Sequence, residues 1–221
     1  NVDGQREQAA LRASLEPLVE IYQHKGDSEC INGLATVAGA PDELCDWEKL
    51  QRPPLQDCGI NGTGQGAFAG LGCTSWLDYV RNVWKVGMEE QVRLGVNPYK
   101  LGVIASTDTH NGTPGSVDEA TFRGHLGLAD NEPEKALGGT ALVIRPLISS
   151  PGGLAGVWAE ENSRDAIFDA LRRRETFGTS GPRIAVRLFA GWEYPVDLCG
   201  DAAMVAKGYL GGVPMGGDLP P

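Results

Sequence analysis

Residues 101–110 constrain the fold most, because an apolar run ends there in two polar side chains and an enforced turn. Valine, isoleucine, leucine and alanine in this run predict a buried strand, and the pairs Asn111-Gly and Pro114-Gly that follow predict a turn. Side chains alternate across a strand, so Asp108 and His110 project to the same side if the extended geometry continues through them. Such a pair, at the point where a strand opens into a loop, is typical of a catalytic or metal site in α/β proteins.

Two interpretations of this pair stay open from its spacing. Asp108 and His110 are either a metal-ligand pair, or a turn-capping aspartate followed by a surface histidine. A third candidate, Glu20, lies in residues 18–22, which alternate in the manner of a strand. A carboxylate within a short apolar strand needs a partner, and that partner is either a metal ion or a nearby lysine or arginine.

The other regular segments alternate between helix and strand, which favours an α/β architecture. We expect a helix from Gln5 to Pro17, a helix over 75–93 with Ser75 as its N-cap, and a helix that begins at Asn162 with Asp165 as capping partner and ends at Arg172-Arg-Arg174. Strands are expected over 154–158 and 184–189. We expect one domain over 1–221, with a long irregular loop over 27–75 and an irregular tail over 205–221.

Charge and hydropathy exclude some classes of partner. With 19 basic and 29 acidic residues the net charge is −10, which disfavours nucleic acid and anionic membranes as partners. No apolar stretch approaches the roughly 20 residues that span a bilayer, so we expect a soluble protein without membrane insertion. Four of the five cysteines lie between 30 and 73, where disulfides would pin the long loop if the protein is exported. Export to a periplasm is compatible with a signal peptide upstream, and the compartment stays open.

Three segments, 18–30, 106–119 and 156–183, resemble the DUF3604 family, which in turn resembles the polymerase and histidinol phosphatase (PHP) superfamily of metal-dependent phosphoesterases. This resemblance implies an irregular or incomplete (β/α) barrel of the PHP or TIM-like type. It also implies a di- or trinuclear metal centre at the carboxyl ends of the strands. Glu20, Asp108 and His110 match metal ligands of that pattern.

The chain departs from the pattern because it contains no His-x-His pair, and its histidines are His24, His110 and His125. It therefore resembles the C-terminal portion of a family member. We expect further ligands to come from a missing N-terminal segment of the same protein, and metal binding by this chain alone to be weak or absent. His125 has no motif behind it and is left out of the expected metal set.

The remaining candidates would bind substrate. Arg183 and Ser180 lie in a tight turn before a strand and could hold a phosphate. His24, just beyond the strand that carries Glu20, would line the mouth of the site, with a solvated loop histidine as the alternative. The arginines at 172–174 fit the negative end of a helix dipole better than a phosphate site.

The sequence thus predicts a metal-dependent hydrolase, phosphoesterase-like by resemblance, that acts on a small and possibly phosphorylated molecule with Zn, Mn or Fe. Asp108 and His110 would be its catalytic residues, and Glu20, Asp108 and His110 its metal ligands. The alternative is a catalytically silent binding or structural domain on a degenerate or truncated barrel, which engages a partner through residues 27–75.

Overall fold

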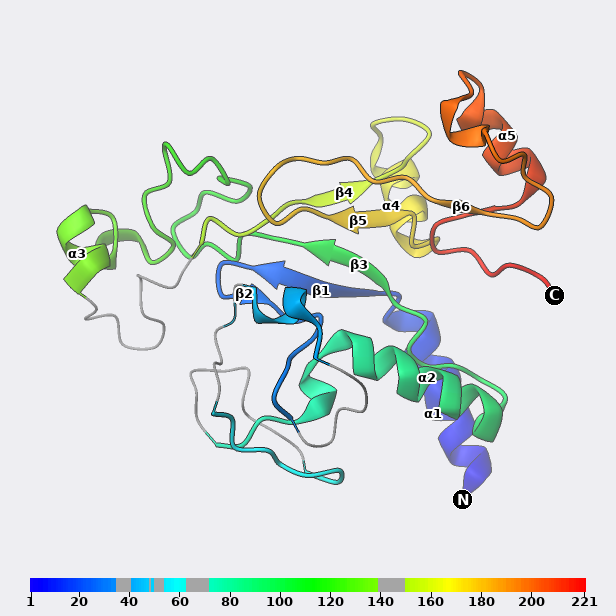
Figure 1. Cartoon of the computed structure of the whole chain (residues 1–221), viewed down its shortest axis with the longest axis horizontal. Helices are drawn as coiled ribbons and strands as arrows, with labels where there is room; N and C mark the ends of the chain where they lie inside the picture. Colours follow the sequence, from blue (N-terminus) through cyan, green and yellow to red (C-terminus); the bar gives the residue numbers. More distant parts are fainter. Residues whose placement is uncertain (35–40, 48, 50–53, 63–71, 139–149) are drawn as a thin grey trace.

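The computed structural model describes residues 1–34, 41–47, 49, 54–62, 72–138 and 150–221 (Figure 1). Its helices are α1 (Val2–Leu15), α2 (Val80–Leu94), α3 (Pro133–Gly138), α4 (Arg164–Arg172) and α5 (Met204–Gly211), with short 3-10 turns between them. Its strands are β1 (Leu18–Gln23), β2 (Gly26–Asp27), β3 (Gly102–Ala105), β4 (Ala155–Val157), β5 (Thr176–Gly178), β6 (Phe189–Ala190) and β7 (Val213–Pro214).

The central element is a three-stranded sheet in the order β2-β1-β3. β1 pairs with β3 in parallel, with Glu20 opposite Ile104, and β2 folds back antiparallel on the end of β1. The chain enters β1 from α1 and β3 from α2, so both helices lie near the amino ends of the two strands (Figure 1). The segments that leave the carboxyl ends therefore share the opposite edge, away from these helices.

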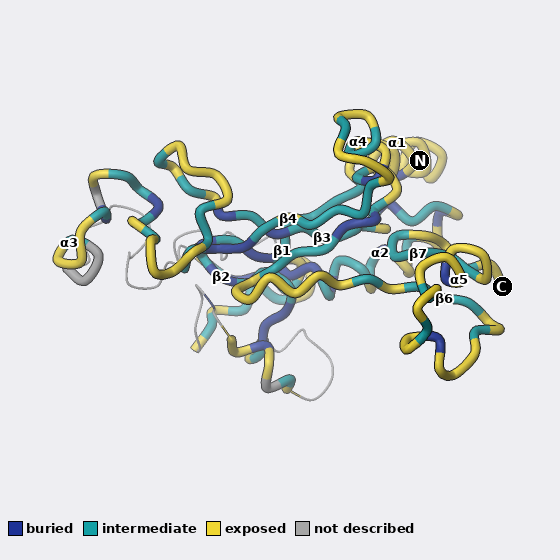
Figure 2. Tube along the Cα trace, turned by 90° about the horizontal axis from the view of Figure 1, so that it is seen from above, coloured by how far each residue is buried: buried dark blue, intermediate teal, exposed yellow. Residues whose placement is uncertain are grey.

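The antiparallel pair of β4 and β5, which are connected through α4, lies beside β3 without a backbone ladder to it (Figure 1). Gly178 of β5 packs so closely that a Cβ there would lie 2.8 Å from the Cβ of Ala105 and 2.9 Å from its nitrogen. Ala105 is 1% exposed, and the central strands are mostly of intermediate exposure with short buried stretches (Figure 2). Glycine at 178 is thus required by the close approach of two backbones.

Local sequence signals fix the ends of the helices. Ser75 caps a 3-10 turn, and Asp78 completes a capping box immediately before α2. Gly95, in the left-handed region with φ +77°, ends α2. α4 is capped by the side chain of Ser163, which accepts from the backbone of Ala166; the cap therefore lies one residue beyond the expected Asn162.

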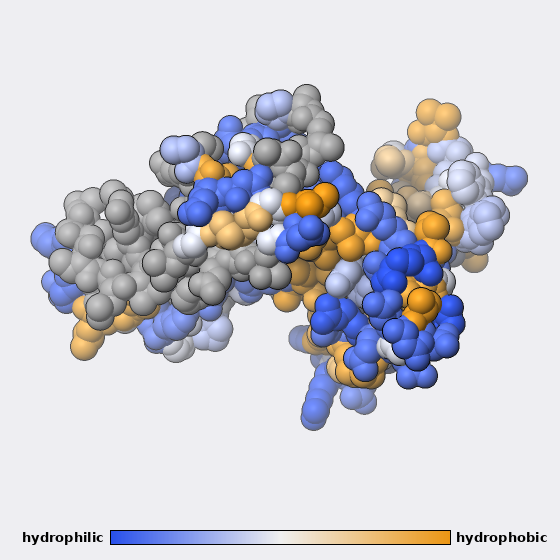
Figure 3. Space-filling model, turned by 90° about the horizontal axis from the view of Figure 1, so that it is seen from below, coloured by the Kyte–Doolittle hydropathy of each residue, from blue (hydrophilic) through white to orange (hydrophobic). Residues whose placement is uncertain are grey.

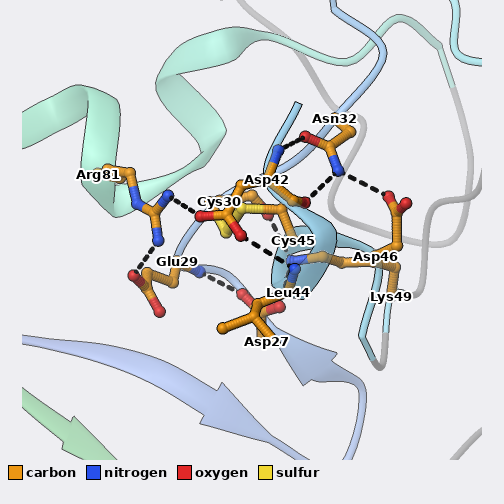
Figure 4. Close-up of a disulfide and its surroundings, with 10 residues drawn as sticks. All are labelled: Asp27, Glu29, Cys30, Asn32, Asp42, Leu44, Cys45, Asp46, Lys49 and Arg81. Carbon is orange, nitrogen blue, oxygen red and sulfur yellow. Dashed lines mark hydrogen bonds and ion pairs between the residues drawn. A yellow bond between two sulfur atoms is a disulfide. The ribbon is translucent and has the colours of Figure 1, made fainter. Parts of the chain in front are cut away.

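Two disulfides hold the long segment after β2. Cys30 pairs with Cys45 and Cys58 with Cys73, each bridge joining residues 15 apart in sequence. Around the first bridge, Arg81 of α2 forms ion pairs with Glu29 and Asp42 (Figure 4). The expected irregular loop is thus anchored to α2 in its described part.

A small apolar core lies beside this bridge. Ile31, Leu34 and Tyr79 are buried together, and Leu55 and Trp76 pack against them. The core joins the segment after β2 to the start of α2, so the long loop and the helix that leads to β3 form one packed unit.

The expected (β/α) barrel is wrong for this chain. The described strands form one sheet of three and two sheets of two, and no closed ring of strands connects them. Closure requires each strand to pair on both sides, whereas every described strand other than β1 and β3 has only two or three residues. Helices and strands do alternate along the chain, but among the described strands only β1 and β3 form a parallel pair.

Two further expectations differ from the structure. Residues 184–188 form an extended segment outside any sheet, and pairing begins at β6, because Trp158 and a local turn satisfy backbone groups of that segment in place of a neighbouring strand. The tail over 205–221 is regular at its start, since α5 continues into β7, which pairs antiparallel with β6.

On the face seen from below, hydrophobic side chains are interspersed with hydrophilic ones at the described surface (Figure 3). α1 exposes Leu11 and Leu15, and α2 exposes Met88 and Val92. Within the described residues, no helix combines the length and the apolar character needed to cross a bilayer.

Candidate metal centre

All three histidines of the chain meet at the carboxyl edge of the β1–β3 pair. His24 directly follows β1, and His110 follows β3 by five residues. The ring centroid of His24 lies 3.9 Å from that of His125, in a stacked arrangement, and 6.2 Å from that of His110. With Asp108, the residues His24 and His110 bring three potential ligand atoms within 4.8 Å of one another.

Asp108 orients the imidazoles of His24 and His110 through one hydrogen bond to each ring. Its Oδ2 lies 3.1 Å from Nε2 of His24, and its backbone carbonyl oxygen lies 2.7 Å from Nδ1 of His110. A carbonyl oxygen and an ionised carboxylate only accept, so each of these ring nitrogens carries the proton. Nδ1 of His24 and Nε2 of His110 are thereby left as the lone-pair nitrogens.

The backbone at Asp108 makes this double contact possible. Its φ of 51° lies in the left-handed region, which aspartate enters more readily than most residues. Extended geometry ends at Ala105, so the expectation that a strand continues through residues 108 and 110 is wrong. The two side chains converge through a turn, with the carbonyl of Asp108 aimed at the ring of His110.

Burial divides the site into a floor and a rim. The His24 side chain is fully buried, whereas the Asp108 side chain is 41% exposed and His110 is exposed. Burial, reinforced by repulsion from His125, lowers the pKa of His24 to about 4, although the Asp108 carboxylate acts in the opposite direction. His24 is therefore neutral at pH 7, with its Nδ1 lone pair available.

His125 extends the floor. Burial lowers its pKa, against the attraction of Asp130. Its Nδ1 lies 3.1 Å from Oδ2 of Asp130 but without hydrogen-bond alignment, and that oxygen accepts instead from the backbone nitrogen of His125. Both ring nitrogens of His125, and Nδ1 of His24, lack a hydrogen-bond partner among the described residues.

Glu20 lies outside this group. The hydroxyl of Ser106 donates to its carboxylate. The partly buried ammonium of Lys25 is also drawn electrostatically toward Glu20, Asp27 and Asp108, which partly offsets the lowering of the Lys25 pKa by burial. Both expected partners of the Glu20 carboxylate therefore stay open. It can be paired with Lys25, or it can bind a metal ion away from the histidine cluster.

Arg183 and Ser180 line a cavity of about 400 Å³ next to the histidine cluster. Tyr22 and Gly152 lie on its wall, and a Cβ at Gly152 would come within 3.1 Å of the His24 backbone nitrogen. Asp118 and Glu119 line the same cavity. The cavity lining therefore carries one guanidinium and two carboxylates. Its electrostatic potential is not purely that of an anion-binding site.

Sequence reasoning did not place His24 or His125 among the ligands. A usable signal existed for His24, because the residues that follow two neighbouring parallel strands meet at one edge of the sheet. His125 has no such signal. It is carried by a loop whose turn at Gly124, with φ +79°, and whose contacts with Asp130 are tertiary features.

A family model described as "Protein of unknown function (DUF3604)" matches residues 2–221. No curated protein and no solved structure matches the chain.

Proposed function

The chain belongs to the DUF3604 family, and we propose that it is a metal-dependent hydrolase whose metal is held by His24, His110 and Asp108. The supporting observation is that these three residues bring potential ligand atoms within 4.8 Å of one another, while each imidazole donates one ring N–H to Asp108. Metal-binding histidines almost always donate their second nitrogen to a carboxylate or a backbone carbonyl in this way. The similarity of the sequence to the PHP superfamily supports the same proposal.

The residues present fit a divalent cation. The neutral imidazole of His24 with its unpaired Nδ1, together with His110 and a partly exposed carboxylate, suits Zn, Mn or Fe. His125, stacked on His24 with both ring nitrogens unpaired, is available as a further ligand. When bound, the cation supplies Lewis acidity and makes water easier to deprotonate.

The protein groups supply orientation and proton control. Asp108 holds His24 and His110 in fixed tautomers, so neither ring needs to reorient during turnover. His110 is exposed at the rim, so its unprotonated Nε2 can reach a cation that enters from solvent. Arg183 and Ser180, from the adjoining cavity, bind the oxygens of a phosphoester substrate.

Metal binding is tested first, by equilibrium dialysis of the chelator-treated chain against Zn, Mn and Fe, with the metal content measured by mass spectrometry. The sequence led us to expect weak or absent binding by this chain alone, but because His24 joins Asp108 and His110 we now expect near-stoichiometric metal in the wild type. Asp108→Asn keeps an acceptor and tolerates a positive φ, whereas Asp108→Ala loses both features, so affinity should fall in the order wild type, Asp108→Asn, Asp108→Ala. Loss of an orienting partner costs about 10- to 100-fold in affinity.

His110→Ala should also reduce binding, and Asp197→Asn, an exposed aspartate far along the chain, is the matched control. A folded wild type that takes up no metal overturns the proposal and favours a binding domain.

Hydrolysis is tested with the metal-loaded chain on a phosphomonoester, a phosphodiester and a carboxylic ester. We expect phosphoester cleavage that Arg183→Ala weakens through KM. Metal binding without cleavage of any of these esters would leave a metal-binding protein and refute the hydrolase.

A further inference from the structure

The guanidinium of Arg187 lies among three aromatic rings on the side of the molecule away from the histidines. Its central carbon is 4.3 Å from the ring centroid of Trp158, 5.5 Å from that of Tyr209 and 5.6 Å from that of Phe189. All three distances are within the range of about 6 Å in which a cation is attracted to a ring face. We call these three rings the aromatic cage. They come from three elements, since Trp158 follows β4, Phe189 begins β6 and Tyr209 lies on α5.

A buried acid fixes one wall of the cage. The Glu175 side chain is only 4% exposed, and its Oε1 accepts from the hydroxyl of Tyr209 at 2.6 Å. Its Oε2 accepts from Nε of Arg173 at 2.9 Å. The ring of Tyr209 is thus held in place whether or not Arg187 is present.

A cavity of about 420 Å³ adjoins the aromatic cage. Trp158, Tyr209 and Arg187 line it, together with Glu160, Arg173 and Glu175. If Arg187 leaves, two carboxylates face one remaining guanidinium, so the cavity carries a net negative charge beside the rings of Trp158 and Tyr209. Aromatic faces combined with negative charge are the chemistry that recognises guanidinium and quaternary ammonium groups.

The segment that carries Arg187 is weakly attached. Residues 183–188 belong to no sheet, and the side chains of Ile184, Val186 and Leu188 are exposed. Its contacts with the cage are those of the Arg187 side chain and one hydrogen bond from the Trp158 indole to the carbonyl of Val186, and outside the cage the carbonyl of Leu188 accepts from the backbone nitrogen of Met215. Arg187 can therefore leave the cage without breaking a strand ladder.

We propose that the aromatic cage is a binding site for a guanidinium or quaternary ammonium group, and that Arg187 occupies it as an internal ligand. An external cation displaces Arg187 and releases residues 183–187. The site is separate from the histidine cluster, and it does not depend on the proposed hydrolase activity.

The internal ligand sets the expected size of the effect. A side chain tethered next to its site competes at an effective concentration on the order of millimolar. Removal of Arg187 should therefore increase the affinity for an external cation, by about tenfold or more. A cage that acts only as a structural clamp would gain no affinity.

The test is isothermal titration of the 221-residue chain with methylguanidinium and with tetramethylammonium. The variants are Arg187→Ala, which empties the cage, and Arg187→Gln, which keeps the aliphatic stem that packs on the rings. Arg164→Ala, an exposed arginine at the start of α4, is the matched control. Circular dichroism and thermal melting establish that each variant is folded.

We expect both Arg187 variants to bind at least one probe about tenfold more tightly than the wild type, and Arg164→Ala to bind like the wild type. Adding Trp158→Leu to Arg187→Gln should abolish the gain. The proposal is overturned if folded Arg187→Gln binds no more tightly than the wild type, or if the gain survives without Trp158. It is equally overturned if neither Arg187 variant folds, because Arg187 is then a structural clamp.

Discussion

Acidification should destabilise the metal-free chain through His24, and this effect can be separated from ordinary acid denaturation. The ordinary pKa of a histidine is 6.5, and burial lowers that of His24 to about 4 in the folded state. Between these values the unfolded chain binds a proton that the folded chain does not, so the free energy of unfolding falls as pH falls. The contribution of neutral His24 is fully present above about pH 6.5 and is lost as pH falls toward 4.

The size of the effect follows from the same values. One pKa unit corresponds to about 1.4 kcal/mol, so the lowering of the His24 pKa from 6.5 to about 4 corresponds to about 3 to 4 kcal/mol at most. The full burial of the side chain means that solvent screening does not reduce this figure much. Carboxylates whose pKa is lowered by a partner, such as Asp42 and Asp201, contribute stability that is lost only below the ordinary aspartate pKa of 3.8, outside this window.

The assay is urea unfolding with chelator present, at several values between about pH 7.5 and about pH 4.5, for the wild type and His24→Gln. Glutamine retains an N–H donor for Asp108 near the position of Nε2 but does not titrate. The free energy of unfolding should therefore fall with pH more steeply in the wild type, by up to about 3 kcal/mol over the window. Parallel pH profiles for the two proteins would show that His24 does not titrate in this way and would refute the reasoning.

Three predictions concern the scaffold. Replacement of Cys30 and Cys45 by serine should lower the free energy of unfolding by about 3 kcal/mol, since the bridge joins residues 15 apart; a loss below about 1 kcal/mol in urea would mean that packing already holds this segment. Gly178→Ala should cost about 1 to 3 kcal/mol because its Cβ would meet the backbone of β3, whereas Gly200→Ala, in open space, should melt at nearly the wild-type temperature. Ser75→Ala should cost about 1 kcal/mol in the same melts through loss of the capping box, and an unchanged melting temperature would contradict that role.

The sequence predicted the local elements better than their assembly. Residues 101–106 and 18–22 were expected as strands, and the structure pairs β1 with β3 in parallel. The barrel failed because closure depends on hydrogen bonds between segments far apart in the chain, which periodicity does not encode. Residues 184–188 show the same limit, since alternation predicts an extended backbone but cannot say whether a neighbouring strand exists.

In the candidate site, the residues that could be predicted are those marked by a local sequence pattern. The residue that was missed reaches the site through tertiary contacts. Asp108 and His110 were found because a strand, a polar pair and a turn lie consecutively in the sequence. His125 was left out because it reaches the cluster through a loop held by hydrogen bonds from its backbone and that of Leu126 to Asp130.

The histidine cluster requires only two paired strands, whereas a barrel would supply a closed ring of strands. A single parallel pair brings the segments after β1 and β3 to one edge, which places His24 next to Asp108. One residue in the left-handed region then directs a carboxylate to His24 and a carbonyl to His110. Because both contacts originate from Asp108, its turn couples the orientation of the two rings. The candidate site therefore depends on the β1–β3 register and on the backbone of Asp108, and a correct prediction of these residues is compatible with a wrong prediction of the barrel.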